Sequence, residues 1–418
     1  MPPASSSTAR AINDRLALRL LQQEGPLTAG QLKQLTGLSR PSVADLVERL
    51  AEAGLIGVVG ETGAQRRGPN ARLYGIVADR AHLAALDVRT EGVAVVVADL
   101  LGSVLAAASV PIGDETDTGP AVEQAVALVE RTAKEAGVER LHTIGIGAPG
   151  LIDPTTGELR NSSGLPEWHR RLTTALQERL PARVLVENET NLAALAEQRD
   201  GSARDRETFV LLWLGHGIGA AVVLDGALRR GASGGTGEIG FLPVPGTGAL
   251  PSATGCEGGY HSLAGAAAIA RLAAEHGLAA PPVPHEPHAA ALVRAAVARV
   301  AEAAPGGSAS ASDSGSGSAS DPDSGLASRF LDVLADRVAL GAASVIAVLD
   351  PGCVVLAGEV GRAGGEVLAA RVQERLARMS PLPTEVRAGA LGGGAVLRGA
   401  LLMARDGAQD ELFGPSER

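Results

Sequence analysis

The sequence is poor in cysteine, in aromatic side chains and in long apolar runs. Its 2 cysteines, Cys256 and Cys353, cannot build a disulfide framework, which fits a reducing cytoplasm. No apolar run reaches the roughly 18 residues of a membrane helix, and the first ten residues lack the apolar core of a secretory signal. We therefore expect a cytoplasmic chain of two or three domains, whose cores use Ala, Val and Leu in place of aromatic residues.

Charge is distributed unevenly along the 418 residues. The formal net charge of −10 argues against nucleic acid binding by the chain as a whole. Residues 1–80 nevertheless carry 10 Lys and Arg against 7 Asp and Glu, while the remainder carries 27 against 40. A basic head on an acidic body is typical of a regulator whose head meets the phosphate backbone, although +3 over 80 residues also arises by chance.

Residues 11–56 have the pattern of three helices with a tight turn before the third. Gly37 supplies the turn, Ser39 can cap the third helix, and Pro41 suits its first turn. Apolar spacing predicts three buried faces: Ile12, Leu16, Leu20 and Leu21; Leu32 and Leu35; and Val43, Leu46, Val47 and Leu50. Two helices joined by a glycine turn, with the second well capped, form the helix-turn-helix pattern.

Two short strand patterns follow, 55–60 and 71–78, and we predict that they form the wing of a winged helix-turn-helix. If the head binds double-stranded DNA, the first turn of the third helix enters the major groove, and Arg40 can pair with a guanine edge. The predicted contacts come from that helix and from the tip of the wing: Ser39, Arg40, Pro41, Ser42, Ala44, Arg49, Arg66 and Arg67. The alternative is an ordinary helical hairpin with a solvated arginine pair.

From residue 81 strands with glycine turns alternate with helices, which indicates a duplicated α/β fold. TIGIGAPG matches G-x-G-x-x-G at Gly145, Gly147 and Gly150. A turn and hairpin follow the glycines where a dinucleotide site needs a helix, so we reject the dinucleotide interpretation.

Five segments of this body, in order, resemble the ROK family of sugar kinases and sugar-responsive repressors. They are GIGAPGLIDPTTGELRNSSGLPEW, VENETNLAALAE, LGHGIGAAVVLDG, GEIGFLPV and LDPGCVVLAGEVGRAG. The resemblance covers about residues 80–405 and implies a two-lobed, actin-like sugar-kinase body behind a winged head. We accordingly expect a disordered tail at 1–10, the winged domain at 11–79, the body at 80–405 with a serine-rich disordered insert at 305–325, and a tail at 406–418.

The resemblance also shows where this chain departs from a ROK kinase. The first phosphate loop of the family reads D-x-G-G-T, but here Arg89 and Thr90 fill the two glycine positions and Glu91 stands at the Thr position. Glu189 stands where the family has its catalytic Asp, and His216 stands where Thr is usual. Since positioning supplies most of the catalysis in phosphoryl transfer, we predict no catalytic residues and no enzyme activity.

The structural zinc of the family has lost its ligands as well. Phe241, Ser252, Thr254 and Gly259 occupy the positions of the zinc-binding His and Cys residues. Zinc needs Cys, His or carboxylate ligands, so we expect neither metal nor cofactor. We predict that packing holds the loop, with Phe241 as the plug.

By resemblance, the sugar pocket is partly retained in Asn161, Asn188, Glu189 and Glu238, with His261 where the family has Glu. A carboxylate-lined pocket favours a neutral sugar over a sugar phosphate. The sequence thus predicts a ROK transcriptional regulator, a homodimer or homotetramer that binds a palindromic operator and responds to a sugar. The alternatives are a winged sugar kinase and a regulator without an effector.

Overall fold

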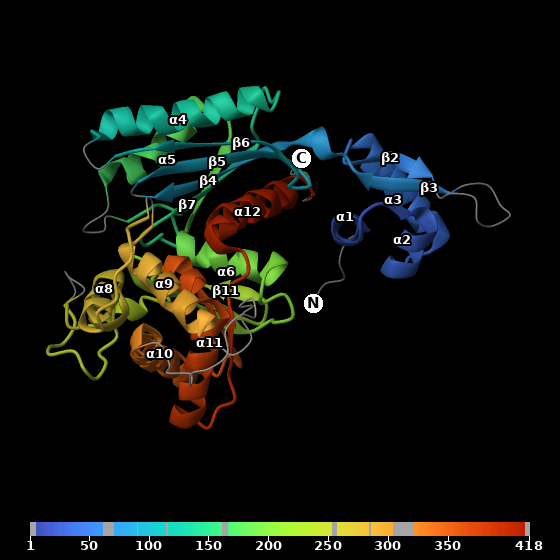
Figure 1. Ribbon diagram of the computed structural model, residues 1–418. Coiled ribbons are helices and arrows are strands. Elements are labelled where there is room, and N and C mark those ends of the chain that lie inside the picture. The colour runs from blue at the N-terminus through green and yellow to red at the C-terminus, as the bar shows by residue number, and fades with distance from the viewer. Residues whose placement is uncertain are drawn as a thin grey trace, which may run out of the picture. The chain divides into compact units, whose positions relative to one another are not determined.

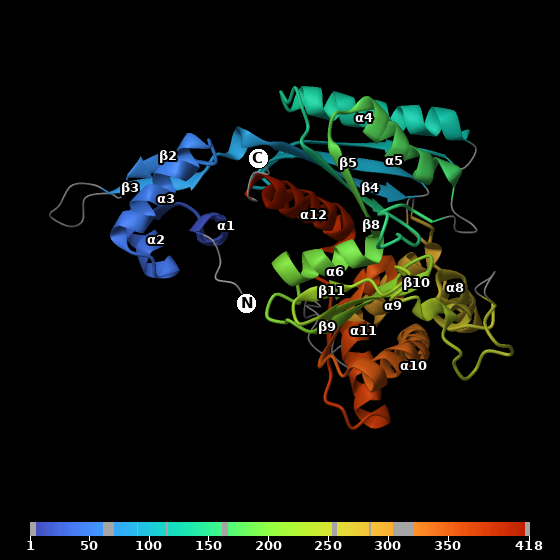
Figure 2. The same ribbon diagram turned by 180° about the vertical axis from the view of Figure 1, so that it is seen from behind.

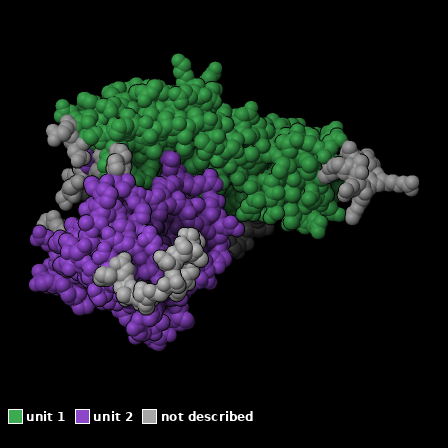
Figure 3. All heavy atoms as spheres, viewed as in Figure 1, with its two compact units in different colours: residues 1–146, 167–185, 400–418 green, residues 147–166, 186–399 purple. Residues whose placement is uncertain are grey.

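The computed structural model of the chain describes residues 6–61, 71–89, 91–113, 116–160, 166–252, 257–283, 286–303 and 322–413 (Figures 1 and 2). The chain divides into two units, which Figure 3 colours green and purple. Unit 1 comprises residues 1–146, 167–185 and 400–418, and unit 2 comprises residues 147–166 and 186–399. Predicted residues Arg66, Arg67, Thr90, Asn161 and Thr254 lie outside the described ranges.

Unit 1 begins with a three-helix head and a three-stranded sheet of order β1-β3-β2. Its elements are α1 (Ser6–Glu24), β1 (Leu27–Thr28), α2 (Ala29–Thr36), α3 (Arg40–Glu52), β2 (Ile56–Glu61) and β3 (Arg72–Ile76). Thr28 and Gln31 form a capping box at α2, and Gly37 ends that helix in the left-handed conformation, with φ of 72°. The predicted winged helix-turn-helix is therefore present.

The core of the head confirms some predicted faces and corrects others. Val43, Leu46, Val47 and Leu50 of α3 are buried as predicted. In α1 the buried face is Ala17, Leu18 and Leu21, whereas Ile12 and Leu16 are 59% and 39% exposed. Leu35 is also exposed, since the short helix α2 presents only Leu32 to the core.

The rest of unit 1 is a five-stranded sheet of order β6-β5-β4-β7-β8 with helices packed on it. Its elements are η1 (Ala78–Arg80), β4 (His82–Arg89), β5 (Gly92–Asp99), β6 (Val104–Pro111), α4 (Thr118–Glu135), β7 (Thr143–Ala148), α5 (Glu167–Arg179), β8 (Arg183–Asn188) and α12 (Ala395–Leu412). A Cβ on Gly145 would lie 2.3 Å from the Ala400 carbonyl oxygen of α12. Gly145 thus serves close packing of a helix on β7.

Unit 2 repeats the same sheet plan, in the order β11-β10-β9-β12-β13. In both sheets an antiparallel three-strand meander precedes two further strands, as expected for a duplicated fold. Its elements are α6 (Glu189–Asp200), β9 (Phe209–Leu214), β10 (Ile218–Leu224), β11 (Ala227–Arg229), η2 (Ile239–Phe241), α7 (His261–Ala264), α8 (Ala266–Glu275), α9 (His288–Glu302), α10 (Pro322–Leu349), β12 (Cys353–Ala357), α11 (Gly358–Met379), β13 (Glu385–Ala388) and η3 (Gly392–Gly394).

The structure moves three of the predicted boundaries. Helix α1 begins at Ser6, so the first ten residues are not all tail, and α12 continues to Leu412 through most of the predicted C-terminal tail. Helix α10 starts at Pro322, inside the predicted insert, and residues 304–321 lie outside the described ranges. Among the residues described, no helix is both long and apolar enough to span a bilayer.

Candidate functional sites

The first turn of α3 presents a small polar surface at the exposed side of the head. Ser39 is the N-cap of α3, where its hydroxyl accepts the Ser42 amide at 3.3 Å and lies 2.9 Å from the Ser42 hydroxyl. Arg40, Pro41 and Ala44 are exposed. Among the described residues, no ion pair holds the Arg40 guanidinium, so this cation can reach outward from the helix start.

The sequence predicts Arg49 as a DNA contact. In the structure its guanidinium forms ion pairs with two carboxylates of the head. Its Nη2 lies 2.5 Å from Asp14 Oδ1 on α1, and its Nη1 contacts the Asp45 carboxylate one turn earlier on α3. Hydrogen bonding to Asp14 is the main cause that raises the pKa of Arg49. The separate contact of Arg49 Nη1 with Asp45 offsets part of the negative charge that Asp45 would present to phosphate beside the helix start.

We expect Asp14→Ala and Arg49→Ala to destabilise the head alike, by about 1–2 kcal/mol, because each removes the same partly buried charged hydrogen bond. Asp45→Asn is the matched control, with an effect under about 0.5 kcal/mol, since Asp45 is mostly exposed. Chemical denaturation of the three variants checks this. If Arg49→Ala weakens DNA binding without lowering the free energy of unfolding, and the Asp14 variant changes neither, then Arg49 contacts DNA.

The residues at the first phosphate-loop position are paired with each other. The Asp87 carboxylate is buried, and its Oδ2 accepts hydrogen bonds from Arg89 Nε at 3.0 Å and Nη2 at 2.8 Å. Burial raises the pKa of Asp87, and Arg89 opposes that shift. The Arg89 side chain therefore occupies the surroundings of the buried carboxylate, where the family has glycine.

His169 lies beside this strand and was not identified from the sequence. It sits in the first turn of α5, 3% exposed, with its ring edge-on to Trp168 at 4.3 Å between centroids. Within the described residues, neither ring nitrogen of His169 has a well-formed hydrogen bond. The nearby Arg89 backbone raises the pKa of His169, but less than desolvation lowers it. Desolvation lowers the pKa of His169 to about 4.

In unit 2 the predicted effector residues Asn188 and Glu189 lie together at the start of α6. The Asn188 side chain caps this helix by accepting the Thr190 amide at 2.9 Å, and its Nδ2 donates to Gly150 O at 3.1 Å and to Glu189 Oε2 at 2.6 Å. All the polar capacity of Asn188 is thereby used within the protein. Its first role is to fix the helix start.

Sequence reasoning missed the buried anchor of this turn, Glu187. Its Oε1 accepts the Asn188 amide at 3.0 Å and Asn191 Nδ2 at 2.9 Å, and its Oε2 lies 2.5 Å from Arg230 Nε. Only the glutamate of this pair is buried, because Arg230 is half exposed. A buried charge with this many donors rigidifies the turn that presents Asn188 and Glu189.

The loop that carries Glu238 runs along β10 toward the same helix. A Cβ at Gly237, where φ is 93°, would lie 1.8 Å from Ala220 O, so glycine alone fits there. Near the start of the same strand β10, Gly219 follows Ile218 and faces Thr190 of α6. Glu238 is exposed as a residue, yet desolvation within its loop raises the pKa of its carboxyl.

His261 opens α7 beside the second glycine loop. Its ring lies near Gly217 and Gly265, and its Cβ lies near Gly240; burial lowers its pKa. Among the described residues, no hydrogen bond joins Asn188 to Glu238 or His261. The structure thus joins Asn188 and Glu189 by a hydrogen bond and places Glu238 and His261 on other elements of unit 2.

The second phosphate-loop position contains a carboxylate that the sequence analysis did not identify. A Cβ at Gly215 would lie 2.6 Å from Glu359 Oε2 and 2.7 Å from Trp213 Nε1. Glu359 is in the first turn of α11, and the exposed His216 follows Gly215. The amides at the start of a helix commonly bind phosphate. At the start of α11, the Glu359 carboxylate lies where a phosphate would otherwise bind.

The described parts of loop 236–261 are held by packing, but not by the residue that we expected. Phe241 is 37% exposed and fills no interior hole. Tyr260 is fully buried in the main core of unit 2, and its hydroxyl donates to Val338 O of α10 at 3.1 Å. Its amide also donates to Leu242 O at 2.9 Å, which closes the base of the loop.

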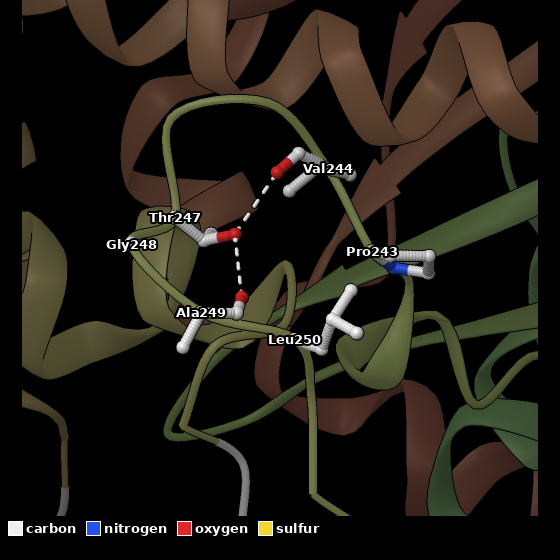
Figure 4. A pocket seen from close by; sticks show the side chains of 6 residues that line it. All are labelled: Pro243, Val244, Thr247, Gly248, Ala249 and Leu250. Carbon is white, nitrogen blue, oxygen red and sulfur yellow. Dashed lines mark hydrogen bonds between the residues drawn. The ribbon is translucent and has the colours of Figure 1, made fainter.

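The tip of this loop is tied by a hydroxyl, as Figure 4 shows. Thr247 Oγ1 donates to Val244 O at 2.9 Å and lies 3.2 Å from Ala249 O, beside a hollow of about 400 Å³. At the predicted zinc positions, Ser252 is exposed, and a Cβ on Gly259 would lie 2.6 Å from Gly240 O. A cysteine at 259 would not fit this backbone, and within the described residues no three metal-binding side chains gather.

Comparisons with known proteins match both parts of the chain. The model of the ROK family matches residues 83–407, and that of the MarR family matches residues 12–68. The DNA-binding transcriptional dual regulator NagC of Escherichia coli is 28% identical over 243 residues. That alignment covers 56% of this chain and 58% of NagC, so it spans little more than half of the curated relative.

Two solved structures share the fold. The ROK family transcriptional regulator described as a homolog of the E. coli MLC protein gives a TM-score of 0.73 at 21% identity, over 97% of this chain and 98% of the other. The ROK hexokinase of Thermus thermophilus gives 0.59 at 29% identity, over 79% of this chain and 99% of its own. The regulator matches head and body together.

Proposed function

This chain belongs to the ROK family, and from that premise we propose that it is a DNA-binding transcriptional regulator, acting as a repressor. The observation that carries the proposal is the winged head, in which a capped helix start presents Arg40 on an exposed face. The MarR match to residues 12–68 and the likeness to NagC support it. Operator DNA in the cytoplasm is the proposed partner, and a homodimer would place two heads on a palindrome.

We further propose that the body does not phosphorylate sugars. Two contacts support this: Arg89 pairs with Asp87, and Glu359 faces Gly215. The sequence adds Glu189, which by resemblance stands at the position of the catalytic Asp. No ATP turnover is therefore expected with any hexose. A coupled nucleotide-turnover assay over a hexose panel checks this, and turnover that Glu189→Gln abolishes would establish a kinase.

The effector is proposed to be a neutral sugar bound near the start of α6. Glu238 and His261 lie on other elements of unit 2, and the side chain of Asn188 is taken up by the helix cap and by its hydrogen bond to Glu189. That internal use of Asn188 also favours a second candidate, a regulator without an effector. Thermal shift of the whole chain over a sugar panel separates the two.

Arg40→Ala is expected to weaken binding to a specific operator by about 10- to 100-fold, because one bidentate contact to a base is worth about 1–3 kcal/mol. Arg131→Ala on α4 is the matched control, since Arg131 is exposed and lies outside the head. Fluorescence anisotropy with labelled upstream DNA at fixed salt measures both. Equal affinity of Arg40→Ala and wild type would remove α3 from the interface.

A further inference from the structure

A second cavity lies in unit 1, where the head joins the sheet. It measures about 490 Å³, within the range of about 300–1,000 Å³ typical of small-molecule sites. Its lining combines the segment after the wing, the starts of three strands and the end of α12: Arg80, Ala81, His82, Arg140, His142, Pro181, Arg183, Glu411 and Leu412. This lining holds three arginines and two histidines against one carboxylate.

The backbone places the basic side chains side by side. His82 begins β4, and Arg183 begins β8, with β7 between these strands. The His142 amide donates to His82 O at 2.8 Å, and the Arg183 amide donates to His142 O at 2.9 Å. Three neighbouring strands therefore start at one end of the sheet with a basic residue at or directly before the first position of each, in fixed register.

This edge is distant from the phosphate-loop residues of the same sheet. Asp87 and Arg89 lie near the other end of β4, and Arg89 is seven residues from His82. A strand rises about 3.3 Å per residue, which separates them by roughly 23 Å. The cavity is thus a different place from the kinase-like motifs.

The cations of the cavity are incompletely matched. Among the described residues, neither Arg80 nor Arg140 makes a side-chain ion pair or hydrogen bond. Glu411 is the one carboxylate of the lining, and it stands 3.8 Å from Arg183 Nη1 and 4.0 Å from His142 Nε2. These distances exceed those of hydrogen bonds, so the donors remain available to a better acceptor.

Glu411 belongs to the turn of α12 that holds the head. Its neighbour Asp410 lies 3.1 Å from Arg15 of α1, and Gln409 Nε2 donates to Gln22 Oε1 of α1 at 2.9 Å and to Leu100 O at 3.1 Å. Both views show the end of α12 beside α1 (Figures 1 and 2). Gln409 and Asp410 thus contact the head helix α1, and the next residue, Glu411, lines the cavity.

We propose that this cavity binds a small phosphate-bearing anion, which displaces the Glu411 carboxylate and thereby weakens the hold of α12 on the DNA-binding head. Arginine is suited to this chemistry, because its planar fork of donors matches phosphate oxygens. The volume leaves room for an organic group beside the phosphate. The effect on DNA rests on the proposed function; the binding of the anion does not.

The test titrates the full-length protein with sodium phosphate and with glycerol 3-phosphate, using glycerol and sodium chloride at matched ionic strength as controls. Calorimetry and thermal shift should show saturable binding to the wild type by the phosphates alone. Arg140→Gln/Arg183→Gln should weaken binding at least tenfold, and Glu411→Gln should tighten it at least threefold. Arg170→Gln, an exposed arginine of α5 in the same unit, should leave it unchanged.

Tighter binding of glycerol 3-phosphate than of phosphate identifies an organic phosphate as the ligand, and equal binding identifies phosphate itself. Absence of binding above the chloride control, or equal binding by the double variant, overturns the site. Operator affinity is then measured with and without glycerol 3-phosphate, and should fall at least threefold for the wild type only. Unchanged operator affinity overturns the displacement of α12.

Two further outcomes separate this proposal from the function on which it rests. Anion binding without any specific DNA binding leaves the site standing and refutes the regulator. If the double variant loses operator affinity when phosphate is absent, the arginines contact DNA themselves, and the proposed coupling of anion binding to the head is refuted.

Discussion

Tyr260→Ala is expected to lower the free energy of unfolding by about 3–5 kcal/mol, the range for removal of a large buried aromatic side chain. Tyr260 is fully buried, and it packs so closely on α10 that a Cβ on Gly341 would lie 2.3 Å from its Cε1. The truncation leaves a cavity between the base of loop 236–261 and α10. Urea denaturation followed by circular dichroism measures the loss.

Two controls separate packing from hydrogen bonding and from the expected plug. Tyr260→Phe removes only the bond to Val338 O and should cost about 1 kcal/mol, because that carbonyl lies within α10. Phe241→Ala should cost less than about 1 kcal/mol, since Phe241 is exposed. A larger loss for Phe241→Ala than for Tyr260→Ala would restore Phe241 as the plug.

His169 is expected to make the stability of unit 1 depend on pH. Its pKa is about 4 in the folded protein, against 6.5 for an unperturbed histidine, because burial disfavours the imidazolium. Between these values the unfolded chain binds a proton that the native state does not. Stability should therefore be complete above pH 6.5 and fall by about 3 kcal/mol as the pH falls to 4.

Denaturation midpoints at pH 7, 5.5 and 4 measure this dependence, and His169→Phe is the matched variant. Phenylalanine retains the edge-on contact with Trp168 and has no proton to bind. The difference between wild type and variant should grow as the pH falls through that window. A wild type and variant with parallel pH profiles would show that His169 is solvated or hydrogen bonded.

The head could be predicted from the sequence where local signals act alone. The cap at Ser39, the glycine at 37 and the spacing of Val43 and Leu46 belong to one helix and its turn, and the structure confirms them. The burial of Leu35 was predicted wrongly, because burial depends on which side of a two-turn helix meets its neighbours. Tertiary packing decides that, and spacing does not.

The motifs of the site could be predicted from the sequence, but the hydrogen-bond and ion-pair partners of its residues could not. Arg49 reads as a free cation on a recognition helix until Asp14, 35 residues earlier, is placed beside it. Likewise, Arg230 lies beside Glu187 and Glu359 lies beside Gly215, although the residues of each pair are far apart in the sequence. Such long-range pairs leave no periodic signal in a single sequence, whereas the Asn188 cap does, since its partners lie within three residues.

The predicted zinc-ligand positions are a case in which sequence and structure together explain more than either. By resemblance, the four positions hold other residues in this sequence. The structure adds that Gly259 touches Gly240 O and that Tyr260 supplies the burial. We infer that the backbone has closed where a cysteine side chain would stand, so a single substitution there cannot rebuild a site.

The most direct test of the central claim is the affinity of the full-length protein for its own upstream DNA relative to a shuffled sequence of equal length and composition. Anisotropy at one fixed salt concentration suffices, because salt alone shifts both affinities. A specific regulator should prefer the upstream DNA by about a thousandfold or more. Equal affinity for the two sequences would contradict the assignment of the head as a specific DNA-binding domain.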